Sequence, residues 1–224
     1  MVVADQQEHG RGRGTKLFSS PAGGLYMSVI LRPDLFPERL PFITLAAGIA
    51  CASAIEEQSG LTIALKWPND LYLQGRKLGG ILAQTGPYSP ASSANTFVIL
   101  GIGINVNTRR ETFAPELRNT VTSLYDVKPE LYVTESLLNA IHSQLCALLP
   151  VLRDDVAAVV NAWRSRDYLL GRKISWQDAR GRTMVGRGAG ISSEGSYLLQ
   201  DAEGTQHVIL AGEVRICPTG EQQK

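Results

Sequence analysis

Residues 9–16 read HGRGRGTK, so three glycines alternate with two arginines and a lysine follows. No aspartate or glutamate occurs from residue 9 to residue 31, so the positive charge of this segment is not balanced nearby. Glycine lets backbone N–H groups approach an anion closely, and the forked guanidinium donors of Arg11 and Arg13 match a carboxylate or a phosphate. The segment therefore predicts a binding site for an anionic small molecule.

Residues 9–16 have two other interpretations on their composition alone. The segment could be a flexible basic loop, or a short arginine–glycine segment that binds RNA. RNA binding is disfavoured because the segment holds only two arginines and lies next to a predicted strand. The net charge of the chain is +1, which argues against broad binding to DNA or to an anionic membrane. Any anion site must therefore come from local charge.

Lys66 is a second candidate, at the start of the run KWPND over residues 66–70. Proline, asparagine and aspartate all favour turns, so an exposed lysine before a β-turn explains the run without any function. If Lys66 points inward instead, its ammonium is a compact charge that could stabilise negative charge developing on a phosphoryl or carboxyl group. The residues alone leave both interpretations open.

Two further runs place glycines inside apolar segments: KLGGIL at residues 77–82 and GIGINVN at residues 101–107. Glycine within a strand often marks a close approach by a ligand or by another backbone. When each run is considered by itself, a bulge or tight packing is the better explanation.

These candidates lie between predicted strands and helices. The run Leu25–Leu31 is apolar and β-branched, which predicts a strand. From Pro41 to Gly60 apolar residues recur at three- and four-residue steps, which predicts an amphipathic helix. The other predicted elements are strands at 61–67 and 96–104, a hairpin of 71–73 and 78–85, a surface loop at 86–95, and helices at 134–149 (capped by Thr134) and 154–165.

The pattern changes after Leu170. Short apolar runs alternate there with glycines and charged turns at a spacing of about ten residues, which predicts a small β-barrel. The five predicted strands are 173–176, 184–188, 196–199, 207–210 and 213–216, and a polar tail follows at 219–224.

The composition excludes several classes of protein. The three cysteines are far apart and form no CxxC pair, so we expect no metal site and no disulfide framework, with Cys51 and Cys146 buried in helices. No apolar stretch approaches the ~18 residues of a membrane span, and the first residues contain no signal-peptide core. A cytoplasmic protein is therefore expected.

The motifs together resemble those of biotin–protein ligases. Residues 4–33 resemble the biotin-binding loop and following strand of that family, and KWPND, KLGGIL and GIGINVN follow in the same order. Residues 122–124 and 163–171 also fit. The barrel region, with its turn at residues 211–213, resembles the family's SH3-like C-terminal domain.

The resemblance implies an α+β fold: a mixed β-sheet with helices packed mainly on one face, followed by a small SH3-like β-barrel. It places the catalytic domain at residues 1–168 and the SH3-like domain at residues 169–224. Residues Val2–Ala4 look like the end of a buried strand. We therefore expect two parts of the family's chain to be absent: the strand and helix that carry its Ser-Thr-Asn motif, and the DNA-binding domain of some members.

The resemblance also implies an activity. Family members use ATP, with Mg²⁺ on its phosphates, to form biotinyl-5'-AMP, and then transfer biotin to one lysine of a biotin carboxyl carrier protein. The residues here that match biotin-contacting positions are Gln7, Arg11, Gly12, Arg13 and Lys66. Nucleotide contacts are expected from Arg11, Arg13 and Asn105, and catalytic roles from Lys66 and Arg13.

The sequence departs from the family pattern in places. Gly14-Thr15 replace the commoner Arg-Gly pair, and Phe18 stands where tryptophan is usual. Cys217 falls where some members have an arginine that reaches the nucleotide, with Arg215 two residues away on the same strand face.

Two alternative functions remain open, the first because of the expected missing segment and the second because lipoate and octanoyl ligases share the fold. One is a truncated, catalytically impaired homologue that only binds ligand or carrier. The other is a relative that uses lipoate or octanoate. In each case the resemblance predicts no DNA or membrane partner, and it allows a homodimer.

Overall fold

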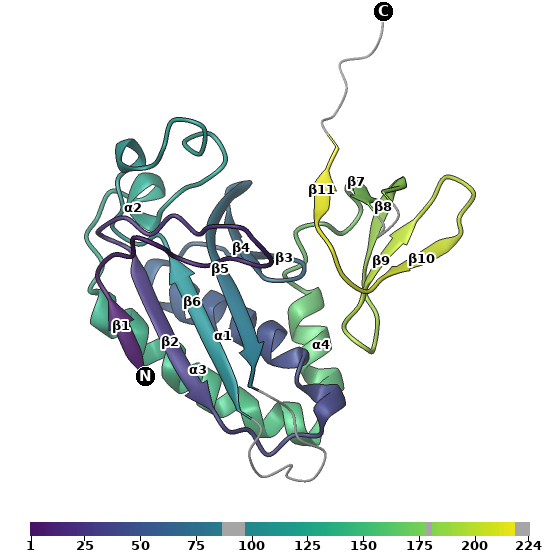
Figure 1. The fold of residues 1–224 in the computed structure, drawn as a ribbon, viewed down its shortest axis with the longest axis horizontal. Helices are drawn as coiled ribbons and strands as arrows, with labels where there is room; N and C mark the ends of the chain where they lie inside the picture. Colours follow the sequence, from purple (N-terminus) through teal and green to yellow (C-terminus); the bar gives the residue numbers. More distant parts are fainter. Residues whose placement is uncertain (87–96, 178–180, 218–224) are drawn as a thin grey trace, which may run out of the picture.

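The computed structural model describes residues 1–86, 97–177 and 181–217, and its strands form two antiparallel sheets (Figure 1). The first sheet has six strands in the order β1-β2-β6-β5-β4-β3. Their bounds are β1 Val2–Ala4, β2 Leu25–Leu31, β3 Ala64–Lys66, β4 Asp70–Leu73, β5 Arg76–Thr85 and β6 Val98–Ile104. The surface loop predicted at 86–95 and the polar tail predicted at 219–224 fall almost entirely outside the described residues.

Strand β6 lies in the middle of the first sheet, as its unbroken apolar sequence predicted. It pairs with β2 on one side and with β5 on the other, in both cases over seven residues. The hairpin of β4 and β5 is also confirmed. Its two turn residues, Gln74 (φ 48°) and Gly75 (φ 78°), both adopt the left-handed conformation that a two-residue hairpin turn requires.

The helices cover one face of this sheet (Figure 1). The first, α1 Phe42–Ser59, ends at Gly60, whose φ of 70° closes the helix in the left-handed conformation. It contacts β3, β4 and β5 and also α3 and α4, so it is buried on more sides than the predicted amphipathic helix would be. The other helices are α2 Leu124–Val127, α3 Thr134–Asp154 and α4 Val156–Arg164, with short 3-10 turns at Pro37–Arg39 and Arg110–Thr112.

Two details of the helix predictions were wrong. Thr134 is the first residue of α3 rather than its cap, and its side chain makes no capping hydrogen bond. The next helix does have a capping side chain, because Asp155 accepts a hydrogen bond from the Ala158 N–H. Cys51 is buried in α1 as predicted, but Cys146 is exposed on the outer side of α3.

The C-terminal region forms a five-stranded antiparallel sheet with the order β10-β9-β8-β7-β11, which is consistent with the predicted SH3-like barrel. Its strands are β7 Lys173–Gln177, β8 Thr183–Ile191, β9 Tyr197–Gln200, β10 Gln206–Ile209 and β11 Val214–Ile216. All strand pairs of the first sheet are antiparallel, and isolated parallel bridges outside these pairs join Leu65 to Asp167 and Lys77 to Val121.

The second sheet is attached to the first part of the chain by buried contacts that we call the junction. The Trp67 Nε1–H donates to the Gly195 carbonyl at 3.0 Å, and the Tyr197 hydroxyl donates to Asp167 Oδ2 at 3.0 Å. The Arg164 guanidinium donates twice to the Ile191 carbonyl, at 2.9 and 2.6 Å. The side chains of Trp67 and Tyr197 also pack together, so both regions share one hydrophobic core.

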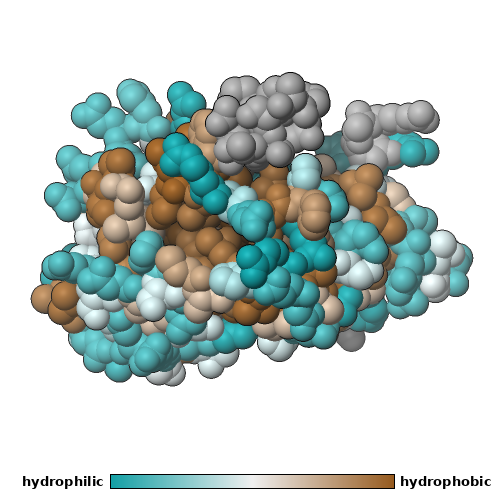
Figure 2. Space-filling view, turned by 90° about the horizontal axis from the view of Figure 1, so that it is seen from below, coloured by the Kyte–Doolittle hydropathy of each residue, from teal (hydrophilic) through white to brown (hydrophobic). Residues whose placement is uncertain are grey.

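Strand β1 lies at the edge of the first sheet and is not the buried strand that its sequence predicted. Val2 and Val3 are 70% and 49% exposed, because only β2 pairs with this strand. Ile30 of β2 and Ile99 of β6, which pair with each other, are also exposed. Seen from below, hydrophobic residues gather in the middle of the molecule with hydrophilic residues around them (Figure 2). None of the helices in the described ranges is both long and apolar enough to cross a membrane.

Candidate functional site

A cavity of about 650 Å³ lies on the sheet face opposite the helices. We call it the first cavity. Its floor comes from β2, β5 and β6, and its walls come from the segment between β1 and β2, from the KWPND turn and from the start of β11. Residues far apart in the sequence therefore form one site.

The segment from Gln7 to Ser20, here called the 7–20 loop, is an irregular hairpin. Its backbone hydrogen bonds run from Gln7 N–H to Ser20 O (3.0 Å), from Phe18 N–H to Gly10 O (2.8 Å) and from Gly12 N–H to Lys16 O (2.8 Å). In Figure 1 it is the dark purple segment that runs from β1 toward β11. These bonds fix the glycines and arginines of the loop at the cavity wall.

Glycines at three positions explain how the loop and the floor fit together. A Cβ on Gly10 would lie 2.4 Å from the Phe18 carbonyl oxygen, so only glycine allows the hairpin to close there. A Cβ on Gly103 would lie 2.5 Å from the Phe18 ring, so this glycine makes room for a side chain of the protein itself. Gly101 has no such neighbour closer than 3.7 Å, and it leaves the floor of the cavity open.

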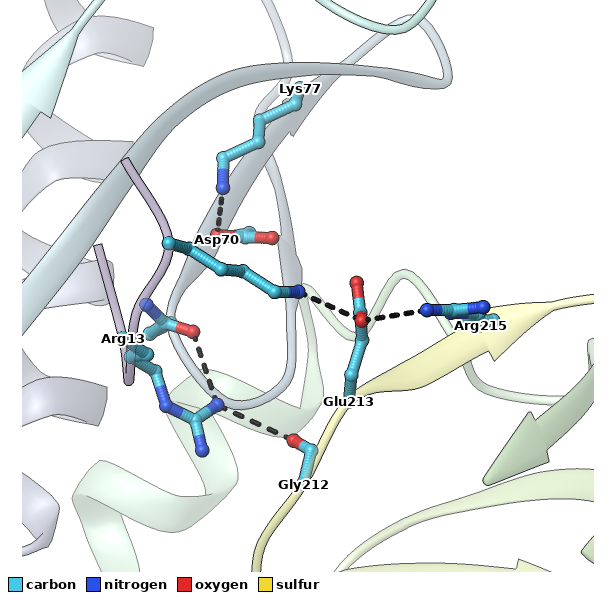
Figure 3. A network of polar contacts seen from close by, with 8 residues as sticks. Arg13, Asp70, Lys77, Gly212, Glu213 and Arg215 are labelled. Carbon is cyan, nitrogen blue, oxygen red and sulfur yellow. Dashed lines mark hydrogen bonds and ion pairs between the residues drawn. The ribbon is translucent and has the colours of Figure 1, made fainter. Parts of the chain in front are cut away.

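Several charged side chains that line the first cavity lie close to one another (Figure 3). The Lys77 ammonium lies 2.6 Å from Asp70 Oδ1, and the Lys16 ammonium lies 2.8 Å from Glu213 Oε2. Arg13 Nη1 donates to the Asn69 side-chain oxygen and to the Gly212 carbonyl, both at a long 3.5 Å. We call the contacts of Arg13 and Lys16 with residues 212–213 the cavity mouth.

Lys66 lies in the cavity wall, which supports the inward interpretation of this residue. Burial lowers the pKa of its ammonium, and the nearby carboxylates of Asp70 and Glu213 oppose that effect. Its Nζ lies 5.5 Å from the centre of the Tyr72 ring. None of the hydrogen bonds or ion pairs of the described residues engages this ammonium, so it is available to a ligand.

The structure brings together five of the six predicted site residues, since all but Asn105 line the first cavity. The five are Gln7, Arg11, Gly12, Arg13 and Lys66. Asn105 is buried and lies outside the cavity lining. Its side-chain N–H donates to the Thr122 carbonyl at 2.9 Å, so the amide holds the segment beyond β6 and does not face the cavity.

Four charged residues of the cavity were not predicted as individual site residues: Lys16, which ends the 9–16 segment, and Asp70, Lys77 and Glu213. Asp70 and Lys77 belong to the runs KWPND and KLGGIL, which gave the signal, but turn propensity alone explained the aspartate. Glu213 immediately precedes β11 of the second sheet, about 200 positions from its partner Lys16, and no local pattern predicts that contact. The hydrogen bond from Lys16 lowers the pKa of the Glu213 carboxyl.

The charges of the cavity suit anionic ligands. The five cations Arg11, Arg13, Lys16, Lys66 and Lys77 face the two carboxylates of Asp70 and Glu213, which leaves the wall positive. Among the described residues, no group of three or more His, Cys, Asp or Glu side chains could hold a metal ion. The cavity can therefore hold two anionic reactants together and offset the charge that builds up between them.

Comparisons with known proteins agree on one family. The model of the biotin/lipoate A/B protein ligase family matches residues 1–105. The biotin–[acetyl-CoA-carboxylase] ligase of Paracoccus denitrificans is 32% identical, over 95% of this chain and 88% of that protein. The bifunctional ligase/repressor BirA of Bacillus subtilis is 34% identical over 94% of this chain, which spans 64% of BirA's length.

Solved structures are similar as well. The biotin protein ligase of Aquifex aeolicus in complex with biotin and ATP superposes with a TM-score of 0.83 at 29% identity. The similarity covers 96% of this chain and 88% of that one, so it includes both sheets.

Proposed function

This chain belongs to the biotin–protein ligase family, and we propose that it joins biotin to ATP and then transfers the biotinyl group to a lysine of a carrier protein. The observation that carries the proposal is the first cavity, where a cationic wall lies beside an open floor at Gly101. Such a cavity suits a ligand with an uncharged body and a carboxylate that must meet a polyphosphate.

The proposed reaction has two steps. In the first, a biotin carboxylate oxygen attacks the α-phosphorus of ATP, the bond to the β-phosphate oxygen breaks, and pyrophosphate leaves. In the second, the lysine amine attacks the acyl carbon of biotinyl-5'-AMP, the bond to the phosphate oxygen breaks, AMP leaves, and the amine loses a proton. Both reactants of the first step are anionic, so clustered cations lower its barrier.

We assign the binding and catalytic roles by position. Gln7, Arg11 and Gly12 hold biotin, while Arg11 and Arg13 also meet the nucleotide phosphates. The ammonium of Lys66 in the cavity wall bridges carboxylate and α-phosphate and acts with Arg13 on the transition state. Asn105 is left out of the direct nucleotide contacts because its side chain is buried against residue 122.

Mg²⁺ enters this proposal as part of the ATP substrate. Among the described residues, the carboxylates that line the cavity are Asp70 and Glu213, and each is paired with a lysine. The chain thus contributes cations to the reaction, and the metal remains on the phosphates, where it offsets their charge.

The proposed acceptor is a biotin carboxyl carrier domain of a carboxylase, because relatives carry the name biotin–[acetyl-CoA-carboxylase] ligase. We also propose the division of labour that the sequence suggested. Residues 1–168 contain most of the cavity, and residues 169–224 contribute its mouth through Gly212 and Glu213.

Biotin-dependent exchange of labelled pyrophosphate into ATP tests the proposal. The expected result is exchange that requires both biotin and Mg²⁺, with lipoate as the competing substrate. A folded sample that gives no pyrophosphate exchange with biotin contradicts the proposed first step. If exchange occurs with lipoate and not with biotin, the substrate is lipoate, which the description of the matching family model also names.

A further inference from the structure

The ammonium of Lys66 lies near the ring of Tyr72, which belongs to the neighbouring strand. Its Nζ is 5.5 Å from the ring centre, and in the described part of the chain no hydrogen bond or ion pair engages it. Lys66 pairs with Asp70 across β3 and β4, and Ala64 pairs with Tyr72. Because side chains alternate along a strand, Lys66 and Tyr72 lie on the same face of the sheet as diagonal neighbours. The strand register therefore fixes the ring beside the ammonium.

The carboxylate opposite Lys66 in this register is engaged by another cation. Asp70 Oδ1 lies 2.6 Å from the Lys77 ammonium (Figure 3). The pairing of β4 with β5 shifts just before Tyr72, so Lys77 stands opposite Tyr72, where an unbroken register would place Leu78. Bulges often re-aim side chains next to reaction sites. Here the bulge supplies Lys77 as the partner of Asp70, and Lys66 is left without an ion pair.

A second ring, that of Tyr168, supports Tyr72 from the other side of β3. The Tyr168 N–H donates to the Leu65 carbonyl at 2.9 Å, whereas β4 pairs with the opposite edge of β3. The two ring centres are nevertheless 4.5 Å apart, with 29° between the ring planes, so the rings meet over β3. The Tyr168 hydroxyl also donates to the Gly75 carbonyl at 3.3 Å, which ties it to the turn between β4 and β5.

Both rings present neutral, electron-rich faces to cations. Burial raises the pKa of the Tyr72 hydroxyl, so this ring stays uncharged. The Arg172 guanidinium lies 4.4 Å from the centre of the Tyr168 ring, and its Nε donates to the Tyr168 carbonyl at 2.6 Å. Neither ring lines the first cavity or the smaller cavity of about 340 Å³ beside it. A ligand in the first cavity would therefore meet Lys66 and not the rings.

We propose that the Tyr72 ring, supported by Tyr168, positions the Lys66 ammonium for the first step of the reaction and keeps it protonated without an ionic partner. This inference rests on the proposed function, because that function gives Lys66 its role. A ring face attracts an ammonium and offers no strong acceptor that competes with the ligand. All three N–H donors of Lys66 then remain for the biotin carboxylate and the α-phosphate. A carboxylate partner would occupy these donors and offset the charge that the reaction needs.

The ring contact should affect the titration of Lys66. Burial lowers the pKa of this ammonium, and the charges of Lys77 and Lys16 lower it as well. The carboxylates of Asp70 and Glu213 oppose that effect. The ring acts in the same direction as the carboxylates, because it attracts the protonated form. Loss of the ring should therefore lower the pKa further, and the reaction should lose rate at a lower pH on the alkaline side.

Three substitutions in the full chain test the role of the rings. Tyr72→Leu removes the ring and keeps an apolar side chain, and Tyr168→Leu removes the supporting ring. Tyr72→Phe is the matched control, because it keeps the ring and loses only the hydroxyl. NMR titration of the side-chain ammonium signal, assigned with Lys66→Met, gives the pKa of Lys66. We expect this pKa to fall by about 0.5–1 in Tyr72→Leu, by less in Tyr168→Leu, and to stay unchanged in Tyr72→Phe.

Biotin-dependent pyrophosphate exchange gives the kinetic readout. The maximal rate of Tyr72→Leu should be about five- to tenfold lower, because the contact supports a charge that the transition state needs. The KM values for biotin and ATP should change by less than about twofold, since the rings do not touch the ligands. Tyr72→Phe should match the unaltered chain. A purely structural role of the ring would leave the Lys66 pKa unchanged.

The NMR titration separates this inference from the proposed function. If the unaltered chain gives no pyrophosphate exchange, the proposed function fails, while a lower Lys66 pKa in Tyr72→Leu than in Tyr72→Phe still supports the ring contact. If the Tyr72→Leu chain does not fold, Tyr168→Leu decides the result. Equal pKa values and equal exchange rates in the two Tyr72 variants overturn the inference. In a chain that does catalyse exchange, it is also overturned when only one of these two quantities differs.

Discussion

The second sheet touches the first part of the chain in two places of very different character. At the junction, Trp67 and Tyr197 are at most 5% exposed and each makes a hydrogen bond of 3.0 Å. At the cavity mouth, the side chains of Lys16 and Glu213 are 61% and 44% exposed, and the hydrogen bond from Arg13 to the Gly212 carbonyl is 3.5 Å long. Buried contacts hold position, whereas exposed ion pairs contribute little to stability. The second sheet is thus fixed at the junction and adjustable at the cavity mouth.

The largest loss of stability should come from a substitution at the junction. Trp67→Ala removes a buried indole, and we expect the free energy of unfolding to fall by about 3–5 kcal/mol. Trp67→Phe is the matched control, since it keeps most of the packing and loses only the donor to Gly195, at a cost of about 1 kcal/mol. Urea denaturation measures both. A loss below about 1 kcal/mol for Trp67→Ala would mean that the junction does not fix the second sheet.

Lys66 tests the cavity itself. Lys66→Met should lower the rate of biotin-dependent pyrophosphate exchange by about 10²- to 10³-fold, because one preorganised charge is removed from the transition state. Stability should change by less than about 1 kcal/mol, since burial already disfavours the charged ammonium of Lys66. Lys173→Met, at an exposed lysine of β7, should change neither quantity. Equal exchange rates for the two variants would remove Lys66 from the proposed mechanism.

Tyr197→Phe tests a single hydrogen bond of the junction, the one from the Tyr197 hydroxyl to Asp167. It leaves the Asp167 side chain without its hydroxyl donor, and we expect a loss of about 1–3 kcal/mol of stability. Burial raises the pKa of Asp167, and the hydrogen bond from the Tyr197 hydroxyl partly offsets that rise. Because the substitution removes this hydrogen bond, it should raise the pKa of Asp167 further. A carboxyl whose folded-state pKa is raised destabilises the fold as the pH rises above the ordinary value of 3.8. The stability lost in Tyr197→Phe should therefore be larger at neutral pH than near pH 3.8. A loss of stability that does not depend on pH would contradict this explanation.

The smallest loss of stability should come from a substitution at the cavity mouth. Glu213→Gln should cost less than about 1 kcal/mol of stability, because both partners of the Lys16–Glu213 pair are exposed. The pKa of Glu213 is lowered in the fold, so its contribution is present above the ordinary value of 4.5 and is lost as the pH falls through the folded-state pKa. Denaturation curves on both sides of that value check the sign. A loss as large as that of Trp67→Ala would remove the contrast between the two contacts.

The sequence predicted the strands and helices well, because each is determined by local patterns. Val98–Ile104 is apolar throughout and lies in the sheet centre, and Gly60 ends α1. Which residues the packing of distant elements leaves exposed was harder to predict. The side chain of Cys146 has the apolar character of a core residue, yet it is exposed on α3, whereas Cys51 is buried in α1. Val2 and Val3 are exposed because β1 is an edge strand.

In the candidate site, too, local features were predictable from the sequence and long-range contacts were not. Residues of the 7–20 loop and Lys66 were predicted from charge and from motif, and the structure places them in one cavity. The same motif reasoning included Asn105, which the structure turns away from the cavity because its amide bonds to the Thr122 carbonyl. The contribution of Glu213 depends on how the second sheet is attached, which no local pattern encodes.

Hydrogen–deuterium exchange with and without biotin and MgATP tests the central claim most directly. That claim is that the first cavity binds these ligands and that its mouth adjusts while the junction stays fixed. Amide exchange should slow in residues 7–20 and 211–215. It should stay equally slow with and without ligand at the junction, in residues 65–67 and 195–197. Unchanged exchange in the 7–20 loop, or slowing confined to the junction, would contradict the account.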